Sequence, residues 1–370
     1  MSAILPDSAR ALSYGVRMPA ACHLIAPTFA TRPIALMRVA GLTPFIAHLV
    51  RSGLPVEEIE MLTSANLLSR LLEHSESLIP TARAYELMED AGVARGVEHL
   101  GLLAGAETPI HALGAFGRQI AAAPSLGDAL DVLVRLAPGF DTGGRWWLVR
   151  QGQRVRLCHE TTVAPGLSHR QADQYWLAIA LRLLRAAEGG RGPDEIRLQT
   201  AEVRGLRSHV LLAGARLAFS QPATSIGFPA SMLSVAMSRR PTATPIGQFD
   251  LERWHATAPA GDFLGSIEQV IATLSSPDYP RIDAVARVVG TGVRTLQRRL
   301  AEAGSSYERM LTRARLGTAA QLLSNTSATV LEIALDVGYS DHAHFTRAFR
   351  RWTGMPPRDF RKHAATLARP

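Results

Sequence analysis

The chain carries one sequence pattern twice near its C-terminal end, and this duplication constrains the fold more than any other feature. The two copies occupy residues 282–304 and 329–354. Apolar residues and glycines recur in the same order in both, and the second half of the later copy is shifted by one residue. Corresponding positions, first copy and then second, are Val285 and Ile333, Val289 and Val337, Gly290 and Gly338, Leu296 and Phe345, and Leu300 and Phe349. Such a repeat indicates the duplication of one supersecondary unit.

The later copy has the pattern of two short helices joined by a tight turn. Thr329-x-x-Glu332 has the form of a capping box, which predicts the start of the first helix. Gly338 permits a turn conformation that other residues avoid, and Ser340 is a suitable N-cap for the second helix. The buried side of the first helix is predicted to consist of Leu331, Ile333, Ala334 and Val337.

The second helix of this copy is amphipathic and basic. Phe345 and Phe349 lie one turn apart, so we expect both to point inward. The residues left for the outer surface are His342, Ala343, Thr346, Arg347 and Arg350. A helix pair that is locked by a glycine turn and exposes a basic face is typical of a helix-turn-helix that enters a DNA groove.

The sequence around the two copies predicts a compact helical domain over residues 262–370. Residues 263–276 are its first helix, and Ser305-x-x-Glu308 predicts a capping box for a long helix that joins the two units. The segment 357–363, which begins with proline, closes the domain. The inner side of the long helix is predicted to carry Met310, Leu311, Ala314, Leu322 and Leu323.

The chain in front of this domain has a mixed α/β pattern. Residues 1–35 lack sustained periodicity, and we interpret them as a loose tail. Residues 36–233 contain a largely helical stretch followed by two strands that meet at Gln151-Gly152, which predicts an α+β domain. Residues 234–261 hold prolines, alanines and threonines without periodicity, and we interpret them as a linker with one short helix.

The formal charge of the chain favours a polyanionic partner for the C-terminal domain. The net charge is +8, and residues 262–370 hold 15 Lys+Arg against 10 Asp+Glu. A basic excess on one domain is the electrostatic footprint of nucleic-acid binding. Lys362 is the only lysine of the chain, however, so arginine is preferred throughout and the charge alone does not distinguish DNA binding from a solvated surface.

The cysteine count and the hydropathy pattern exclude several classes of protein. Cys22 and Cys158 are too few for a disulfide framework or a structural zinc site, which fits a reducing cytoplasm. Each precedes a histidine, but we interpret the repeated dipeptide as coincidence. No apolar run approaches the roughly 18 residues that cross a bilayer. We therefore expect a cytoplasmic protein with no metal, no cofactor and no membrane partner.

Catalytic signatures are missing from the sequence. His159-Glu160 begins the metalloprotease pattern H-E-x-x-H, but Val163 occupies the position of the second histidine. No nucleophile elbow, P-loop or paired-carboxylate arrangement occurs either. These absences do not exclude catalysis, but they favour a protein that is not an enzyme.

Residues 262–363 resemble the AraC/XylS family of transcription regulators. The resemblance is carried by residues 293–304, by Arg315-x-x-x-Ala319-x-x-Leu322-Leu323, by residues 332–354 and by Pro357-x-x-Phe360-Arg361. Residues 100–136 give the region in front a weaker similarity to the arabinose-binding-type effector domain of some members. The resemblance implies an α+β N-terminal effector domain followed by an all-α DNA-binding domain with two helix-turn-helix motifs.

The family implies that each unit places a recognition helix in one of two successive major grooves, about 34 Å apart. Arginine can bind guanine O6 and N7, and glutamine can bind adenine N6 and N7. The base-contacting residues implied by the motif are Arg294, Gln297 and Arg298 in the first unit, and His342, Ala343, His344, Thr346 and Arg347 in the second. The residues expected to contact phosphate are Arg299, Arg350, Arg351, Arg361 and Lys362.

These features predict a sequence-specific regulator that binds double-stranded DNA as a homodimer. Its N-terminal domain is expected to bind a small-molecule effector, and RNA polymerase would be a further partner of an activator. One alternative is a DNA-repair protein that transfers an alkyl group to a cysteine, which two isolated cysteines disfavour. Another is a regulator that has no ligand and is controlled by a protein partner or by its abundance.

Overall fold

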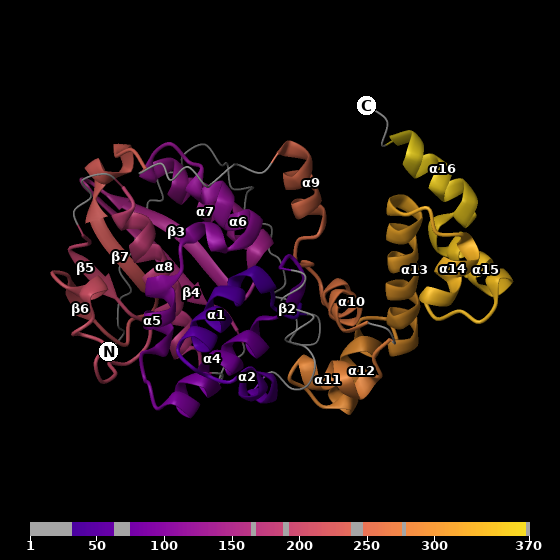
Figure 1. Cartoon of the computed structure of the whole chain (residues 1–370), viewed down its shortest axis with the longest axis horizontal. Helices are drawn as coiled ribbons and strands as arrows, with labels where there is room; N and C mark the ends of the chain where they lie inside the picture. Colours follow the sequence, from indigo (N-terminus) through magenta and orange to yellow (C-terminus); the bar gives the residue numbers. More distant parts are fainter. Residues whose placement is uncertain are drawn as a thin grey trace, which may run out of the picture.

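The computed structural model describes two packed parts, an α/β part and an all-helical part (Figure 1). This arrangement confirms the predicted fold class. Of the predicted tail, residues 1–31 lie outside the described residues, and so does Cys22. The residues that the structure describes are 32–62, 75–163, 168–187, 192–237, 247–275 and 279–367.

A five-stranded sheet forms one layer of the N-terminal part, with the strand order β3-β4-β7-β5-β6. The predicted hairpin is confirmed: β3 pairs antiparallel with β4, and Gly152 adopts a φ of +58° at the turn. Only β5 and β6 pair in parallel among these strands. The bounds are β3 Gly144–Gln151, β4 Arg154–Thr161, β5 Glu195–Arg197, β6 Arg216–Ala218 and β7 Thr224–Pro229.

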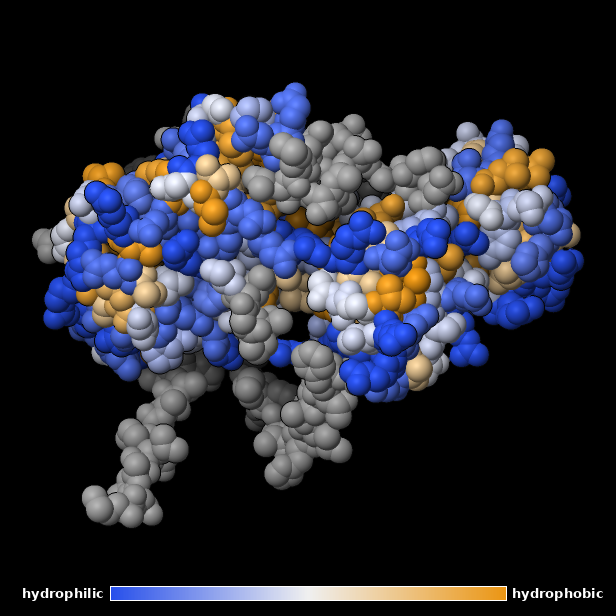
Figure 2. Space-filling view, turned by 90° about the horizontal axis from the view of Figure 1, so that it is seen from below, coloured by the Kyte–Doolittle hydropathy of each residue, from blue (hydrophilic) through white to orange (hydrophobic). Residues whose placement is uncertain are grey.

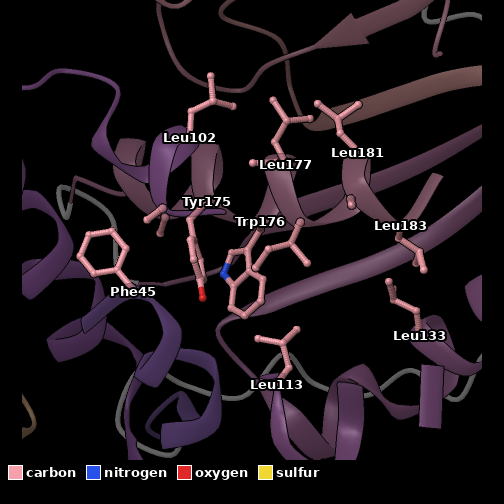
Figure 3. Close-up of a cluster of buried hydrophobic side chains, with 14 of the residues drawn as sticks. Phe45, Leu102, Leu113, Leu133, Tyr175, Trp176, Leu177, Leu181 and Leu183 are labelled. Atoms are coloured by element: carbon pink, nitrogen blue, oxygen red, sulfur yellow. The ribbon is translucent and has the colours of Figure 1, made fainter. Parts of the chain in front are cut away.

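Helices pack on the sheet and on one another to form the main core. Helix α8 is buried along most of its length and packs closely against α5. Figure 3 shows Tyr175 and Trp176 of α8 within this core, with Phe45 of α1 beside Tyr175. The bounds are α1 Thr43–Arg51, α2 Val56–Leu62, α4 Thr81–Arg95, α5 Leu100–Glu107, α6 Gly114–Ala121, α7 Leu126–Phe140 and α8 Arg170–Arg185.

The sequence did not predict a two-stranded ribbon that lies between the two parts. Strand β1 (Leu36–Arg38) pairs antiparallel with β2 (Leu78–Pro80). The side chains of Leu36 and Leu78 belong to the same hydrophobic core as the first half of the helical part. Helix α10 (Phe263–Leu274) packs on β2, where Thr273 donates a hydrogen bond of 2.8 Å to the Leu78 carbonyl.

The segment interpreted as a linker also packs against the N-terminal part. It contains helix α9 (Gln248–Ala256), in which Trp254 is buried. The Arg38 guanidinium stacks on the Trp254 ring at 4.6 Å and donates a 2.6 Å hydrogen bond to the Trp254 carbonyl. The chain between the two parts is therefore anchored at α9.

The helical part contains two cores that share one long helix. Met310 and Ala314 of α13 lie in the first core, whereas Leu316, Ala319 and Leu323 of the same helix lie in the second. Figure 1 shows α13 between α10–α12 on one side and α14–α16 on the other. The remaining bounds are α11 Ile282–Val288, α12 Val293–Glu302, α13 Tyr307–Asn325, α14 Val330–Asp336, α15 His342–Thr353 and α16 Pro357–Leu367.

Close packing of α5 on α8 requires glycine at position 101. A Cβ atom at Gly101 would lie 1.9 Å from the Gln171 carbonyl oxygen. We expect Gly101→Ala to lower the free energy of unfolding by about 1–3 kcal/mol, because backbone atoms must separate to admit the methyl group. Chemical denaturation followed by circular dichroism measures the change.

Gly317 in α13 is the matched control, because a Cβ atom there meets only Glu268 Oε1 at 3.9 Å. Gly317→Ala should raise the free energy of unfolding by about 0.5–1 kcal/mol, as expected for an open helical position. Equal destabilisation by both substitutions would contradict the proposed packing of α5 on α8.

Candidate nucleic-acid interface

The first helix-turn-helix unit consists of α11 and α12. Val285 and Leu296 are completely buried between the two helices, and the turn contains Gly290 with a φ of +70°. Arg294, Gln297 and Arg298 of α12 are exposed, on the opposite side from the core. Figure 2 views the molecule from the side on which α11 and α12 lie, and hydrophilic residues cover much of that surface.

Arg299 does not share this exposed face, and its predicted phosphate contact stays a prediction without support from its position. Its side chain is 9% exposed and stacks on the Phe263 ring at 4.1 Å. It also donates a 2.6 Å hydrogen bond to the Arg32 carbonyl. Adjacent residues on a helix point in directions about 100° apart, so Arg299 faces inward while Arg298 faces solvent.

The second unit begins with the predicted capping box. Thr329 accepts a 3.2 Å hydrogen bond from the Glu332 amide, and the Glu332 carboxylate accepts one of 2.6 Å from the Thr329 amide. The predicted buried residues Ile333, Ala334 and Val337 are all buried. Leu331 is 53% exposed, so its assignment to the buried side is wrong.

The N-cap of the recognition helix α15 is Asp341, not Ser340 as predicted. The Asp341 carboxylate accepts hydrogen bonds of 2.9 Å from the Ala343 amide and 3.1 Å from the His344 amide. These backbone donors lower the pKa of the Asp341 carboxyl group. A carboxylate at this position also complements the positive end of the helix dipole.

The N-cap of α13 also lies one residue later than predicted. Ser306, rather than Ser305, caps the helix by accepting a 3.3 Å hydrogen bond from the Arg309 amide. Both serines suit a cap, and the pattern at Ser305 favoured the wrong one. The inner side of α13 is confirmed at Met310, Ala314 and Leu323.

Helix α15 exposes most of the residues predicted to face DNA. His342, Ala343, His344 and Arg347 are exposed, whereas Phe345 and Phe349 are completely buried. Thr346 is only partly exposed, and its hydroxyl oxygen is inaccessible to solvent. The structure therefore does not present the Thr346 hydroxyl group to a ligand. Arg350 and Arg351 are also exposed at the end of this helix.

Arg361 has a structural role, and its predicted phosphate contact stays a prediction. Its Nε donates a 3.2 Å hydrogen bond to the Leu323 carbonyl, and its Nη2 donates to the Ala328 carbonyl. These bonds tie α16 to the end of α13. Lys362, the next residue, is exposed.

The described residues were also compared with the requirements of a metal site and of a membrane span. They contain no group of three or more metal-ligating side chains, and none of their helices has the length and apolar character needed to span a membrane. Cys158 is buried in β4, and burial raises the pKa of its thiol to about 11. A thiol of this kind is a poor nucleophile at neutral pH, which disfavours alkyl transfer to this residue.

Two helix-turn-helix units that share a helix, behind an α/β domain, define a two-domain DNA-binding regulator. Residues 53–237 match the family model described as "Arabinose-binding domain of AraC transcription regulator, N-term". Residues 285–363 match a model described as "Helix-turn-helix domain". The chain belongs to the AraC/XylS family of transcription regulators and has an arabinose-binding-type N-terminal domain.

The chain is similar to several regulators of known name. The ornithine utilization regulator of Pseudomonas aeruginosa is 25% identical over 280 residues, which cover 75% of this chain and 82% of that protein. VqsM of the same organism is 40% identical over 101 residues, which cover 26% of this chain and 31% of that protein. The solved structure of CdpR from P. aeruginosa covers 87% of this chain and 98% of its own, at 20% identity and a TM-score of 0.41.

Replacement of Asp341 tests the corrected start of α15. We expect Asp341→Ala to lower the melting temperature, because the amides of Ala343 and His344 lose their acceptor. Asp341→Asn should lower it less, since its side-chain oxygen still accepts a hydrogen bond. Ser340→Ala is the matched control and should melt like the wild type. A larger effect at Ser340 than at Asp341 would contradict the assignment.

Proposed function

We propose that the protein regulates transcription by reading two successive major-groove segments, one with α12 and the other with α15. The observation that carries this proposal is the helix α13, which contributes residues to both cores and so fixes the spacing between the two units. Two recognition helices on a rigid spacer suit two turns of the major groove on one face of the duplex.

Direct readout is assigned to the exposed polar residues of the two recognition helices. In α12 these are Arg294, Gln297 and Arg298, whose side chains carry the donors and acceptors that read guanine and adenine. In α15 the corresponding residues are His342, His344 and Arg347, and Ala343 offers an apolar contact of the kind that suits a thymine methyl group. Thr346 is left out of this set because its hydroxyl oxygen is buried.

Phosphate contacts are assigned to Arg350, Arg351 and Lys362. All three are exposed: Arg350 and Arg351 lie near the end of α15, and Lys362 lies in the middle of α16. Cations at these positions would fix the orientation of the second unit on the duplex without reading its sequence. Arg299 and Arg361 are left out of this set because they bind backbone carbonyls.

The N-terminal domain is proposed to bind a small metabolite and to form a homodimer in the cytoplasm. Its contact with the first unit through Leu36 and Leu78 offers a route by which a ligand would change DNA binding. RNA polymerase is a further partner if the protein activates transcription. Support comes from RhaS of Escherichia coli, a transcriptional activator that is 42% identical over 81 residues, covering 22% of this chain and 29% of that protein.

Arg298→Ala and Arg347→Ala test the two-segment proposal. Each should lose about 1–3 kcal/mol of binding free energy at one base position, if each arginine makes a bidentate contact with guanine. The two affected positions should lie about one helical turn apart. Genomic selection of binding sites, followed by titration of single-base variants, measures both quantities.

Arg150→Ala is the control for this experiment, because Arg150 is exposed on strand β3 of the other domain. It should bind the preferred site like the wild type. Unchanged discrimination in both test variants would refute the assignment, and effects confined to one base position would refute reading by two helices.

Arg351→Ala tests the phosphate assignment separately from base readout. It should weaken binding to all sequences by a similar factor and reduce the slope of log affinity against log salt by about one unit. Fluorescence anisotropy at several salt concentrations measures this slope. A loss of affinity at only one base position would instead make Arg351 a base-reading residue.

A further inference from the structure

The N-terminal domain contains an open groove large enough for a small ligand, away from the helix-turn-helix units. Its volume is about 450 Å³, which lies within the range of small-molecule sites. The groove lies between the end of α8, the short helices η2 (Ile110–Ala112) and η3 (Val210–Leu212), and the last residue of α6.

The ionisable residues that line the groove are all basic. They are Arg182 and Arg185 of α8 and His111 of η2, and the described lining residues include no carboxylate. Arg182 and Arg185 are three positions apart on α8, so their side chains leave the same face of the helix. This charge favours an anion in the groove.

Arg185 retains part of its hydrogen-bonding capacity for a ligand. Its Nη2 donates to the carbonyls of Val210 at 3.0 Å and Leu211 at 3.1 Å. The two carbonyls are neutral, so they do not balance the charge of the Arg185 guanidinium. They engage only one of its three nitrogens, and a guanidinium has five N–H donors in all. Within the described chain Arg185 has no acidic partner at ion-pair distance.

The rest of the groove is apolar. Its lining includes Ile110, Leu183, Leu211 and Met237, together with small residues such as Ala121. A ligand that fits both surfaces therefore has an anionic end and an apolar body, because each buried polar group of the ligand needs a partner.

A smaller void behind Ile110 indicates which way the ligand points. Ile110 lines both the groove and this void of about 20 Å³, which Leu113 and Trp176 also line. Figure 3 shows Trp176 directed from α8 towards Leu113. Asp141 lines the void too, and burial raises the pKa of its carboxyl group to about 6. The described lining of the void includes no basic residue, so the anionic end of the ligand is assigned to the arginines of the groove.

We propose that this groove is the effector site and that it takes an organic monocarboxylate with an apolar body, held by Arg185 and Arg182. This assignment rests on the proposed role of the N-terminal domain in binding an effector. It names a class of ligand, and it places the acid at the end of α8 and the apolar body against Ile110 and Leu211.

Isothermal titration of the full chain with a matched series of probes tests the charge preference. The probes are 4-phenylbutyrate, 4-phenylbutylamine and 4-phenylbutanol, which share one apolar body and differ in the charge of the head group. We expect the acid to bind about tenfold or more tightly than the other two, because its hydrogen bonds to guanidinium are charge-assisted.

Variants of the chain locate the site. Arg185→Gln should weaken binding of 4-phenylbutyrate by about tenfold or more, and Arg185→Lys should retain part of it because the charge remains. Ala121→Phe should abolish binding by filling the groove while leaving both arginines in place. Arg150→Gln, on the exposed surface of β3, is the charge-matched control and should bind like the wild type. Circular dichroism verifies the fold of each variant.

Three results would overturn the proposal. They are equal binding of the amine or the alcohol, undiminished binding of the acid to both Arg185→Gln and Ala121→Phe, and no measurable binding of the acid to the wild type. The titration contains no DNA, so its outcome is independent of operator recognition. If the two-segment proposal failed, the ligand-binding result would still hold. If the ligand titration failed, the two-segment proposal would still hold.

Discussion

The rest of the structure depends on how the ribbon β1–β2 is held between the two parts of the chain. Arg38 of β1 is completely buried and donates hydrogen bonds to the carbonyls of Gly139, Glu76 and Trp254. A buried charge without partners would cost several kcal/mol, but here acceptors from three segments surround it. Burial lowers the pKa of the guanidinium to about 10, so it remains charged at neutral pH. Arg38 thus joins α7, the ribbon and α9.

This arrangement gives the two DNA-binding units different relations to the N-terminal domain. The first unit shares its core with Leu36 and Leu78 of the ribbon, and Arg299 binds the chain just before β1. The second unit packs mainly on α13 and α16. A ligand-induced movement in the N-terminal domain would therefore reach α12 directly, and would reach α15 only through α13. Helix α13 therefore sets the positions of the exposed arginines of α12 and α15 relative to each other.

Local signals in the sequence predicted much of this structure, and long-range contacts account for what they missed. The capping box at Thr329 and the inward Phe345 follow from spacing within one helix, and both are confirmed. The strands of the ribbon are only three residues long, which is too short to show the alternation of apolar and polar residues that predicts a strand. The inward turn of Arg299 depends on Phe263 and Arg32, which are distant in sequence. The basic groove likewise combines η2, α8 and η3, which no motif connects.

Hydrogen exchange of the full chain, measured by mass spectrometry, tests the central claim that the ribbon and the first unit form one cooperative core. The comparison is between the wild type and Leu36→Ala, which removes a completely buried side chain from that core. The account predicts that peptides of α10 and α12 lose protection in the variant, while peptides of α14 and α15 keep theirs. Unchanged protection of α10 and α12, or an equal loss in α14 and α15, would contradict it.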